Sequence, residues 1–229
     1  MEELIIDSPW VIICEGAGDA AFFRHLIDER KIPKFFITYP NHVIPTAQGG
    51  RDGFTRRLKA IRTLRGFSSV TDLIIVSDND DDPQANFEKV QELIEATEYL
   101  TVPDKPETTA GANPRVSIYM FPQTDVKGQL ETLCLESCGD AWPKIAECLD
   151  GFEKCNQAHF QQWPEEQKKE KMRMRVMISS LCSEDPYTSL VHAWSRKVKM
   201  IPLDHACFDG IAAYLNNVAT SGNLPLATR

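Results

Sequence analysis

The chain has 229 residues, of which 42% are apolar, and a formal net charge of −8. This length suits one α/β domain with an extension, or one domain plus a small helical one. The charge argues against broad, tight binding of nucleic acid by simple attraction. No apolar run reaches the roughly eighteen residues that a membrane-spanning helix needs. The acidic start, MEELIIDSPW, lacks the basic region of a secretory signal. We therefore expect a cytoplasmic protein.

The cysteines and histidines predict no zinc site. The seven cysteines include no Cys-x-x-Cys pair, and the five histidines show no ligand spacing beside them. The odd number of cysteines, with Cys14 inside a predicted strand, favours reduced thiols.

Four apolar runs predict β-strands, with helical patterns between them. We expect strands at 10–14, 35–39, 72–77 and 116–121, and helices at about 18–30, 53–65 and 84–98. This alternation is typical of βαβ units and a mostly parallel sheet flanked by helices. The segment 101–114 is rich in Pro, Thr and Gly, which favours an exposed loop.

After residue 121 the patterns are helical and no further strand is predicted. We therefore divide the chain into an α/β core, residues 1–125, and a mostly helical extension, residues 126–229, packed on the core.

The first strand ends at Glu15-Gly16, where two interpretations compete. Gly16, Gly18 and Ala21 fit the G-x-G-x-x-[GA] turn of dinucleotide-binding proteins. That interpretation is weakened because no acid follows the second strand to bind a ribose, and because Glu15 would direct a negative charge at the pyrophosphate.

The third predicted strand favours a metal site instead, because it delivers Asp78, Asp80, Asp81 and Asp82 directly after an apolar run. Residues two apart in a strand point to the same side, so Asp78 and Asp80 would share one pocket if the extended chain continues that far. The alternative is a solvated turn and a helix cap, which we expect for Asp81 or Asp82.

Glu15 would join these acids, because parallel strands end at the same edge of a sheet. Carboxylates gathered there repel one another unless a cation is present. Oxygen ligands from one Glu and two Asp suit Mg²⁺ or Mn²⁺.

These motifs resemble the Toprim domain, whose signature is a Glu-Gly after the first strand and an Asp-x-Asp after the third. Here they are Glu15-Gly16 and Asp78-Asn79-Asp80, and Asp19 is similar to a further acid in the standalone, OLD-nuclease-like bacterial members. The segments GQLETLCLES and HACFDGIAAYL extend the resemblance over most of the chain.

The resemblance implies a metal-dependent nuclease or nucleic-acid maturase. Glu15, Asp78 and Asp80 would be catalytic and would hold one Mg²⁺ or Mn²⁺, with Glu15 as general base if only one ion binds. Asp19, with Glu131 or Asp82, would help to hold a second. Glu131 is equally well explained as an exposed residue early in a helix. OLD-type nucleases often work with an ATPase, which would be a separate partner because this chain has no G-x-x-x-x-G-K-[ST] motif.

Basic residues are concentrated in two segments, 51–65 and 168–175. Arg51 follows Gly49 and Gly50, where backbone amides could approach a phosphate, and Arg56 and Arg57 could bind a nucleic-acid backbone. A plain loop and a solvated helix face are the alternatives. Four lysines are candidates for a cation that assists the reaction: Lys127, Lys171, Lys197 and Lys199. We also expect Lys127 near nucleic acid.

Two other classes of function stay open. A Toprim-like scaffold could serve as a non-catalytic metal-binding interaction module in a defence or repair complex, and a dinucleotide-binding protein is the third possibility. The sequence does not decide between DNA and RNA, or the oligomeric state.

Overall fold

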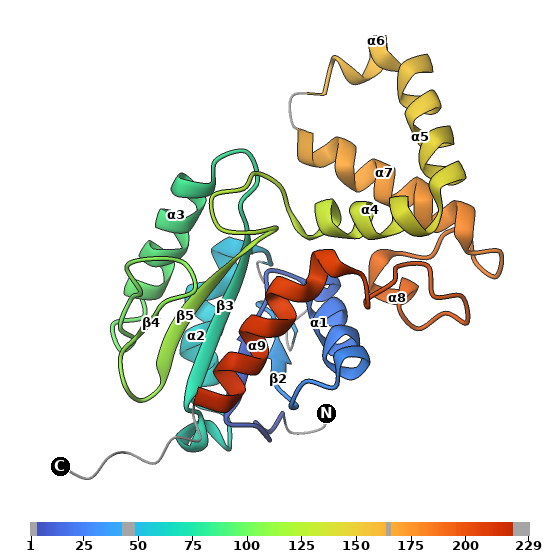
Figure 1. The fold of residues 1–229 in the computed structure, drawn as a ribbon. Helices are drawn as coiled ribbons and strands as arrows, with labels where there is room; N and C mark the ends of the chain where they lie inside the picture. The colour runs from blue at the N-terminus through green and yellow to red at the C-terminus, as the bar shows by residue number, and fades with distance from the viewer. Residues whose placement is uncertain (1–3, 43–48, 164–165, 222–229) are drawn as a thin grey trace.

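The computed structural model describes residues 4–42, 49–163 and 166–221. Its centre is a five-stranded sheet in the order β2-β1-β3-β5-β4 (Figure 1). Four strands run parallel, and the short β4 pairs antiparallel with β5 at one edge. The strands are β1 (Trp10–Ile13), β2 (Phe36–Thr38), β3 (Asp72–Asp78), β4 (Thr109–Ala110) and β5 (Arg115–Phe121). The predicted α/β class with a mostly parallel sheet is therefore confirmed.

The strand β4 corrects one expectation, because it lies within the segment 101–114 that the sequence predicts as a loop. It has two residues, which is too short to produce a pattern of alternating apolar side chains. It covers part of the edge of β5.

Helices cover both faces of the sheet, because successive strand residues point to opposite sides. Ile12, Ile74 and Tyr119 belong to one buried cluster, and their neighbours Val11, Leu73 and Ile118 belong to another. The first cluster is closed by α1 (Ala17–Arg30) and α9 (Asp209–Ser221), and the second by α2 (Phe54–Ile61) and α3 (Pro83–Glu95). Figure 1 shows α9 lying along the sheet beside α1.

The chain after β5 forms helices in all its described regular elements. They are α4 (Leu130–Ala141), α5 (Pro143–Cys155), α6 (Gln157–Phe160), α7 (Glu166–Leu181), α8 (Leu190–Ala193), the 3-10 turn η3 (Ala206–Phe208) and α9. Two further 3-10 turns lie earlier, η1 (Arg51–Gly53) and η2 (Phe67–Ser69).

The helical half shares a core with the sheet. Leu133 of α4 and Met177 of α7 lie in the same buried cluster as Ile12 of β1. The boundary at residue 125 stays a prediction. The helix α9 belongs to the predicted extension, yet it completes a layer on the sheet itself. Within the described residues no helix is long and apolar enough to cross a bilayer.

Candidate metal and catalytic site

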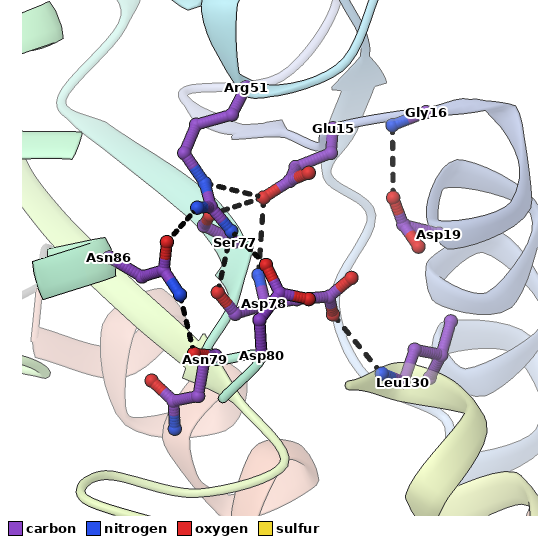
Figure 2. Close-up of polar contacts among 10 residues, drawn as sticks. All are labelled: Glu15, Gly16, Asp19, Arg51, Ser77, Asp78, Asn79, Asp80, Asn86 and Leu130. Atoms are coloured by element: carbon purple, nitrogen blue, oxygen red, sulfur yellow. Dashed lines mark hydrogen bonds and ion pairs between the residues drawn. The ribbon is translucent and has the colours of Figure 1, made fainter. Parts of the chain in front are cut away.

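Acidic side chains meet where β1 and β3 end. The two strands are direct neighbours, with Ile13 opposite Ile75. Glu15 lies two residues beyond β1, and its Oε1 accepts a hydrogen bond of 3.2 Å from the backbone N–H of Asp78, the last residue of β3 (Figure 2). The structure thus brings Glu15 and Asp78 together at one edge of the sheet, as their strand positions predict.

Arg51 lies between two of these acids. Its Nε donates to Glu15 Oε1 at 3.1 Å and its Nη2 to Asp80 Oδ2 at 3.0 Å. The Arg51 side chain is only 15% exposed, so the two ion pairs are largely shielded from water. A partly buried carboxylate needs such a partner, and one guanidinium here serves two.

Arg51 also donates hydrogen bonds to neutral groups. The guanidinium also donates to Ser77 Oγ at 2.8 Å, to the backbone carbonyl of Asp78 at 2.7 Å and to Asn86 Oδ1. Ser77 Oγ in turn donates to Glu15 Oε1. Arg51 is therefore locked in place by β3 and α3. The sequence suggests a place for Arg51 beside a phosphate, and no sequence pattern signals this pairing with the acids.

Asp80 reaches the site through a turn. Its φ of 50° is left-handed, a conformation that Asp tolerates better than most residues. The extended chain therefore stops at Asp78, so the condition under which Asp78 and Asp80 would share one side of a strand is not met. The backbone of Asp80 exchanges two hydrogen bonds, of 2.8 and 2.9 Å, with the backbone of Gly128. The side-chain amide of Asn79 donates hydrogen bonds of 2.7 Å to the carbonyls of Gln123 and Val126.

Two further acids, Asp19 and Glu131, border the site from the helical side. Asp19, in the first turn of α1, accepts from the N–H of Gly16 at 2.9 Å, and Asp78 Oδ1 accepts from the N–H of Leu130 at 3.1 Å (Figure 2). Leu130 begins α4 and Glu131 follows it. The acids Asp19, Asp78 and Glu131 therefore come from three separate elements.

Burial is the main cause of the raised pKa of each of these acids. It raises the pKa of Asp19 to about 7, with the charge of Glu15 adding to it. Burial, followed by the charges of Asp19 and Glu15, raises the pKa of Asp78 well above its ordinary range. The pKa of Glu131 is raised by burial and held down in part by Lys171. These acids thus favour protons or another cation over the ionised, metal-free state.

The pKa of Asp80 is also raised by burial, and here Arg51 opposes the rise both by its charge and by a hydrogen bond. Among the four lysines considered from the sequence, Lys171 is the one whose charge reaches Asp19, Asp80 and Glu131. Lys199 is paired with Glu29 at 2.9 Å instead.

The donor set fits a hard divalent cation in its chemistry. The acids that border the site offer carboxylate oxygens, which suit Mg²⁺ or Mn²⁺. In the described part of the chain, however, no three of these acids each place one oxygen within 4.8 Å of the others. Binding an ion would therefore draw the carboxylates together, beside the positive charge of Arg51.

Asp82 lies outside this group of acids and caps α3, which confirms the helix cap expected for Asp81 or Asp82 and does not place it with the other predicted metal ligands. Its Oδ1 accepts from the N–H of Ala85 at 3.0 Å and caps α3. The turn at Asp80 is followed at once by this helix, so Asp82 falls at the cap position. Asp81 accepts from Gln167 of α7 at 3.0 Å.

The basic residues differ in accessibility. Arg57 is only 4% exposed and donates to Thr38 Oγ1 on β2, so its assignment as a nucleic-acid contact is corrected. It belongs to the inner, apolar side of α2, which the run of arginines and lysines in the sequence conceals. Arg56 and Lys127 are exposed, and their role stays a prediction.

Comparisons with known proteins add a family. The family model described as "Protein of unknown function (DUF3226)" matches residues 9–220, so the chain belongs to this family. No curated protein and no solved structure matches the chain. The matched range includes every acid of the site.

Proposed function

We propose that this member of the DUF3226 family is a Mg²⁺- or Mn²⁺-dependent hydrolase of phosphodiester bonds in nucleic acid. The observation that carries the proposal is the meeting of Glu15, Asp78 and Asp80 at the carboxyl edge of two neighbouring parallel strands. The resemblance of their spacing to the Toprim signature supplies the reaction class. The raised pKa values of Asp78 and Asp80 support a site that needs a cation.

Asp78 is the central ligand in this proposal. It borders Glu15 on one side and the start of α4 on the other, where Glu131 lies. Glu15 contributes through Oε2, because within the described residues the hydrogen bonds of its side chain all end on Oε1. Asp19 lies close enough for its charge to act on Asp78, and it supports a second ion together with Glu131.

A bound divalent ion would polarise the phosphodiester and lower the pKa of a water molecule. The chain's own groups prepare for that chemistry. Arg51 fixes the carboxylates of Glu15 and Asp80 and adds positive charge beside them. In the metal-free protein Asp19 has a pKa of about 7, so an ion that binds there would displace its proton near neutral pH.

Substrate contacts would come from exposed basic side chains. Exposed Arg56 and Lys127 are the candidates among the residues predicted for this role. The formal net charge of −8 limits non-specific attraction, so the proposal favours a local contact or delivery by a partner. A separate ATPase is the proposed partner, on the Toprim resemblance alone.

A second candidate is a non-catalytic metal-binding or interaction module. The observation that favours it is Arg51, whose guanidinium already compensates Glu15 and Asp80 without any metal. Dinucleotide binding receives less support, because Glu15, in the turn after β1, is held by Ser77 and Arg51.

A cleavage assay separates the candidates. The full chain is incubated with end-labelled single- and double-stranded DNA and RNA, with Mn²⁺, Mg²⁺ or EDTA. We expect metal-dependent cleavage that falls by at least about a hundredfold in Glu15→Gln and Asp78→Asn, and not in the exposed control Glu88→Gln on α3.

Binding of Mn²⁺ is measured on the same proteins by calorimetry. Binding without cleavage of any substrate would overturn the hydrolase and support the module. Cleavage that persists in Asp78→Asn would show that the acids described here do not carry it.

A further inference from the structure

A second group of ligand-type side chains lies away from the acid site, between α4 and η3. Glu136, His205 and Cys207 each offer one ligand atom, and the three atoms all lie within 4.8 Å of one another. Cys207 is tied to α4 by a hydrogen bond from its Sγ to the Leu133 carbonyl at 3.5 Å. Figure 1 shows the start of α9, which follows η3, below α4.

We propose that Glu136, His205 and Cys207 bind one divalent metal ion of the zinc type, and Zn²⁺ is the ion that we consider. A thiolate, an imidazole and a carboxylate are the ligands that zinc prefers, and hard ions such as Mg²⁺ avoid the first two. In a tetrahedral zinc site the ligand atoms lie about 3.3–3.8 Å apart. The three atoms therefore need to approach one another by at most about 1.5 Å, which side-chain rotation supplies because Glu136 is exposed.

The surroundings of His205 assign its ligand nitrogen. Its Nε2 lies 3.0 Å from Asp140 Oδ2, and its Nδ1 accepts from the N–H of Cys207 at 3.2 Å. This favours the tautomer protonated on Nε2, so Nδ1 carries the lone pair that a metal takes. Asp140 then orients the ring through Nε2–H, as carboxylates do behind metal-bound histidines. The weaker contact from the Cys207 N–H gives way.

A cavity adjoins this group and leaves room for a water ligand. It has a volume of about 480 Å³, and Glu136, Cys207, Tyr119 and Gly210 are among its lining residues. Three protein ligands leave the fourth position of a tetrahedral ion for a water molecule, for which the cavity beside Glu136 and Cys207 has room. The proposed ion would also join α4 to η3 and so to α9.

The ligand types are present in the sequence, although their spacing matches no zinc motif. His205 and Cys207 are separated by one residue, and Glu136 and Asp140 are four apart on one face of α4. The pair on α4 and the pair at η3 are about seventy residues apart in the chain. The packing of η3 against α4 brings them together.

Cobalt spectroscopy on the reduced, metal-free full chain tests the proposal. We expect one equivalent of Co²⁺ to produce tetrahedral bands and a thiolate-to-cobalt charge-transfer band, which added Zn²⁺ removes. Cys207→Ser should abolish the charge-transfer band, whereas Cys155→Ser, at an exposed cysteine at the end of α5, should leave it unchanged.

Two more variants keep the test decisive if Cys207→Ser fails to fold. Glu136→Gln and Asp140→Asn alter exposed residues and leave the thiol in place, and we expect Co²⁺ affinity to fall by about 10–100-fold in Asp140→Asn and at least as much in Glu136→Gln. Absence of a charge-transfer band in the wild-type protein, or a band of full affinity in Glu136→Gln, would overturn the proposal. Glu15→Gln should retain the band, because the site is independent of the acid site.

Discussion

Asp78 Oδ1 accepts a hydrogen bond of 3.1 Å from the backbone N–H of Leu130, so the last residue of β3 is joined to the first residue of α4. The N-terminus of a helix favours a negative charge, which offsets part of the cost of burying this carboxylate. The bond also brings the helical half of the chain, with Glu131, to the edge of the sheet.

Removal of the Asp78 charge should stabilise the metal-free protein. In Asp78→Asn the amide oxygen still accepts from Leu130, while the repulsion from Asp19 and Glu15 disappears. We expect the unfolding midpoint in EDTA at pH 8 to rise by about 2–4 °C, equivalent to about 1 kcal/mol in a chain of this size. Added Mn²⁺ should raise the midpoint of the wild-type protein and not that of the variant. A lower midpoint in EDTA would contradict the electrostatic description of the site.

Asp19 predicts a pH dependence of stability without metal. Its pKa of about 7 in the folded protein lies above the ordinary value, so the folded state binds the proton more tightly than the unfolded state. Its contribution to the free energy of unfolding is therefore fully present in acid, is lost as pH rises towards 7, and stays lost above. Urea unfolding in EDTA between pH 5 and pH 8 should show this loss in the wild-type protein, reduced in Asp19→Asn.

The same titration governs metal affinity with the opposite sign. A proton on Asp19 competes with a cation, so Mn²⁺ should bind more tightly as pH rises through about 7. Calorimetry at pH 6 and pH 8 measures this difference. Equal affinity at both values would exclude Asp19 as a ligand.

Arg51 should be replaceable by a divalent cation in its stabilising role. Arg51→Met leaves Glu15 and Asp80 without their shared partner, and we expect the free energy of unfolding in EDTA to fall by about 3 kcal/mol. Saturating Mn²⁺ should recover much of this loss, because the ion takes over the compensation of the two acids.

Arg115→Met is the matched control for this experiment. Arg115 pairs with Asp72, a 3% exposed carboxylate at the opposite end of β3, at 2.8 Å. Its loss should be similarly destabilising, and Mn²⁺ should not reduce the difference from the wild-type protein. Equal behaviour of the two variants in Mn²⁺ would show that no cation replaces the guanidinium at the site.

Gly128 should be required for the position of Asp80. Its φ is 130°, and an added Cβ would lie 2.5 Å from Thr132 Oγ1, so Gly128→Ala must disturb the two backbone hydrogen bonds to Asp80. We expect a loss of about 2 kcal/mol in unfolding free energy together with weaker Mn²⁺ binding. Gly139→Ala is the control, because Gly139 lies in α4 and the added carbon would meet no atom of a neighbouring element within 4 Å. It should instead raise the free energy of unfolding by about 0.5–1 kcal/mol.

The strand ends were predictable from local pattern, and the partners of the acids were not. Glu15 and Asp78 each follow an apolar run, and the ends of parallel strands must share an edge, so their meeting needs only the order of the strands. Arg51 depends on how the chain returns from β2 to η1, which no periodicity encodes. Arg57 illustrates the converse, since a basic run that looks solvent-facing hides one buried guanidinium.

The place of α9 could be read only from the folded chain. Its pattern is that of any amphipathic helix, yet Leu215 enters the core beside α1 and Tyr214 Oη donates to Ser117 Oγ of β5 at 2.7 Å. The cluster of Glu136, His205 and Cys207 follows from the same packing.

This arrangement sets an order of events during synthesis. While the ribosome is still translating the helices that follow β5, the sheet face around Ile12, Ile74 and Tyr119 has α1 to cover it but still lacks α9. That face exposes apolar side chains, and is prone to aggregation, until residues 209–221 have left the exit tunnel. A nascent chain stalled before that point is the form that we expect chaperones to recognise.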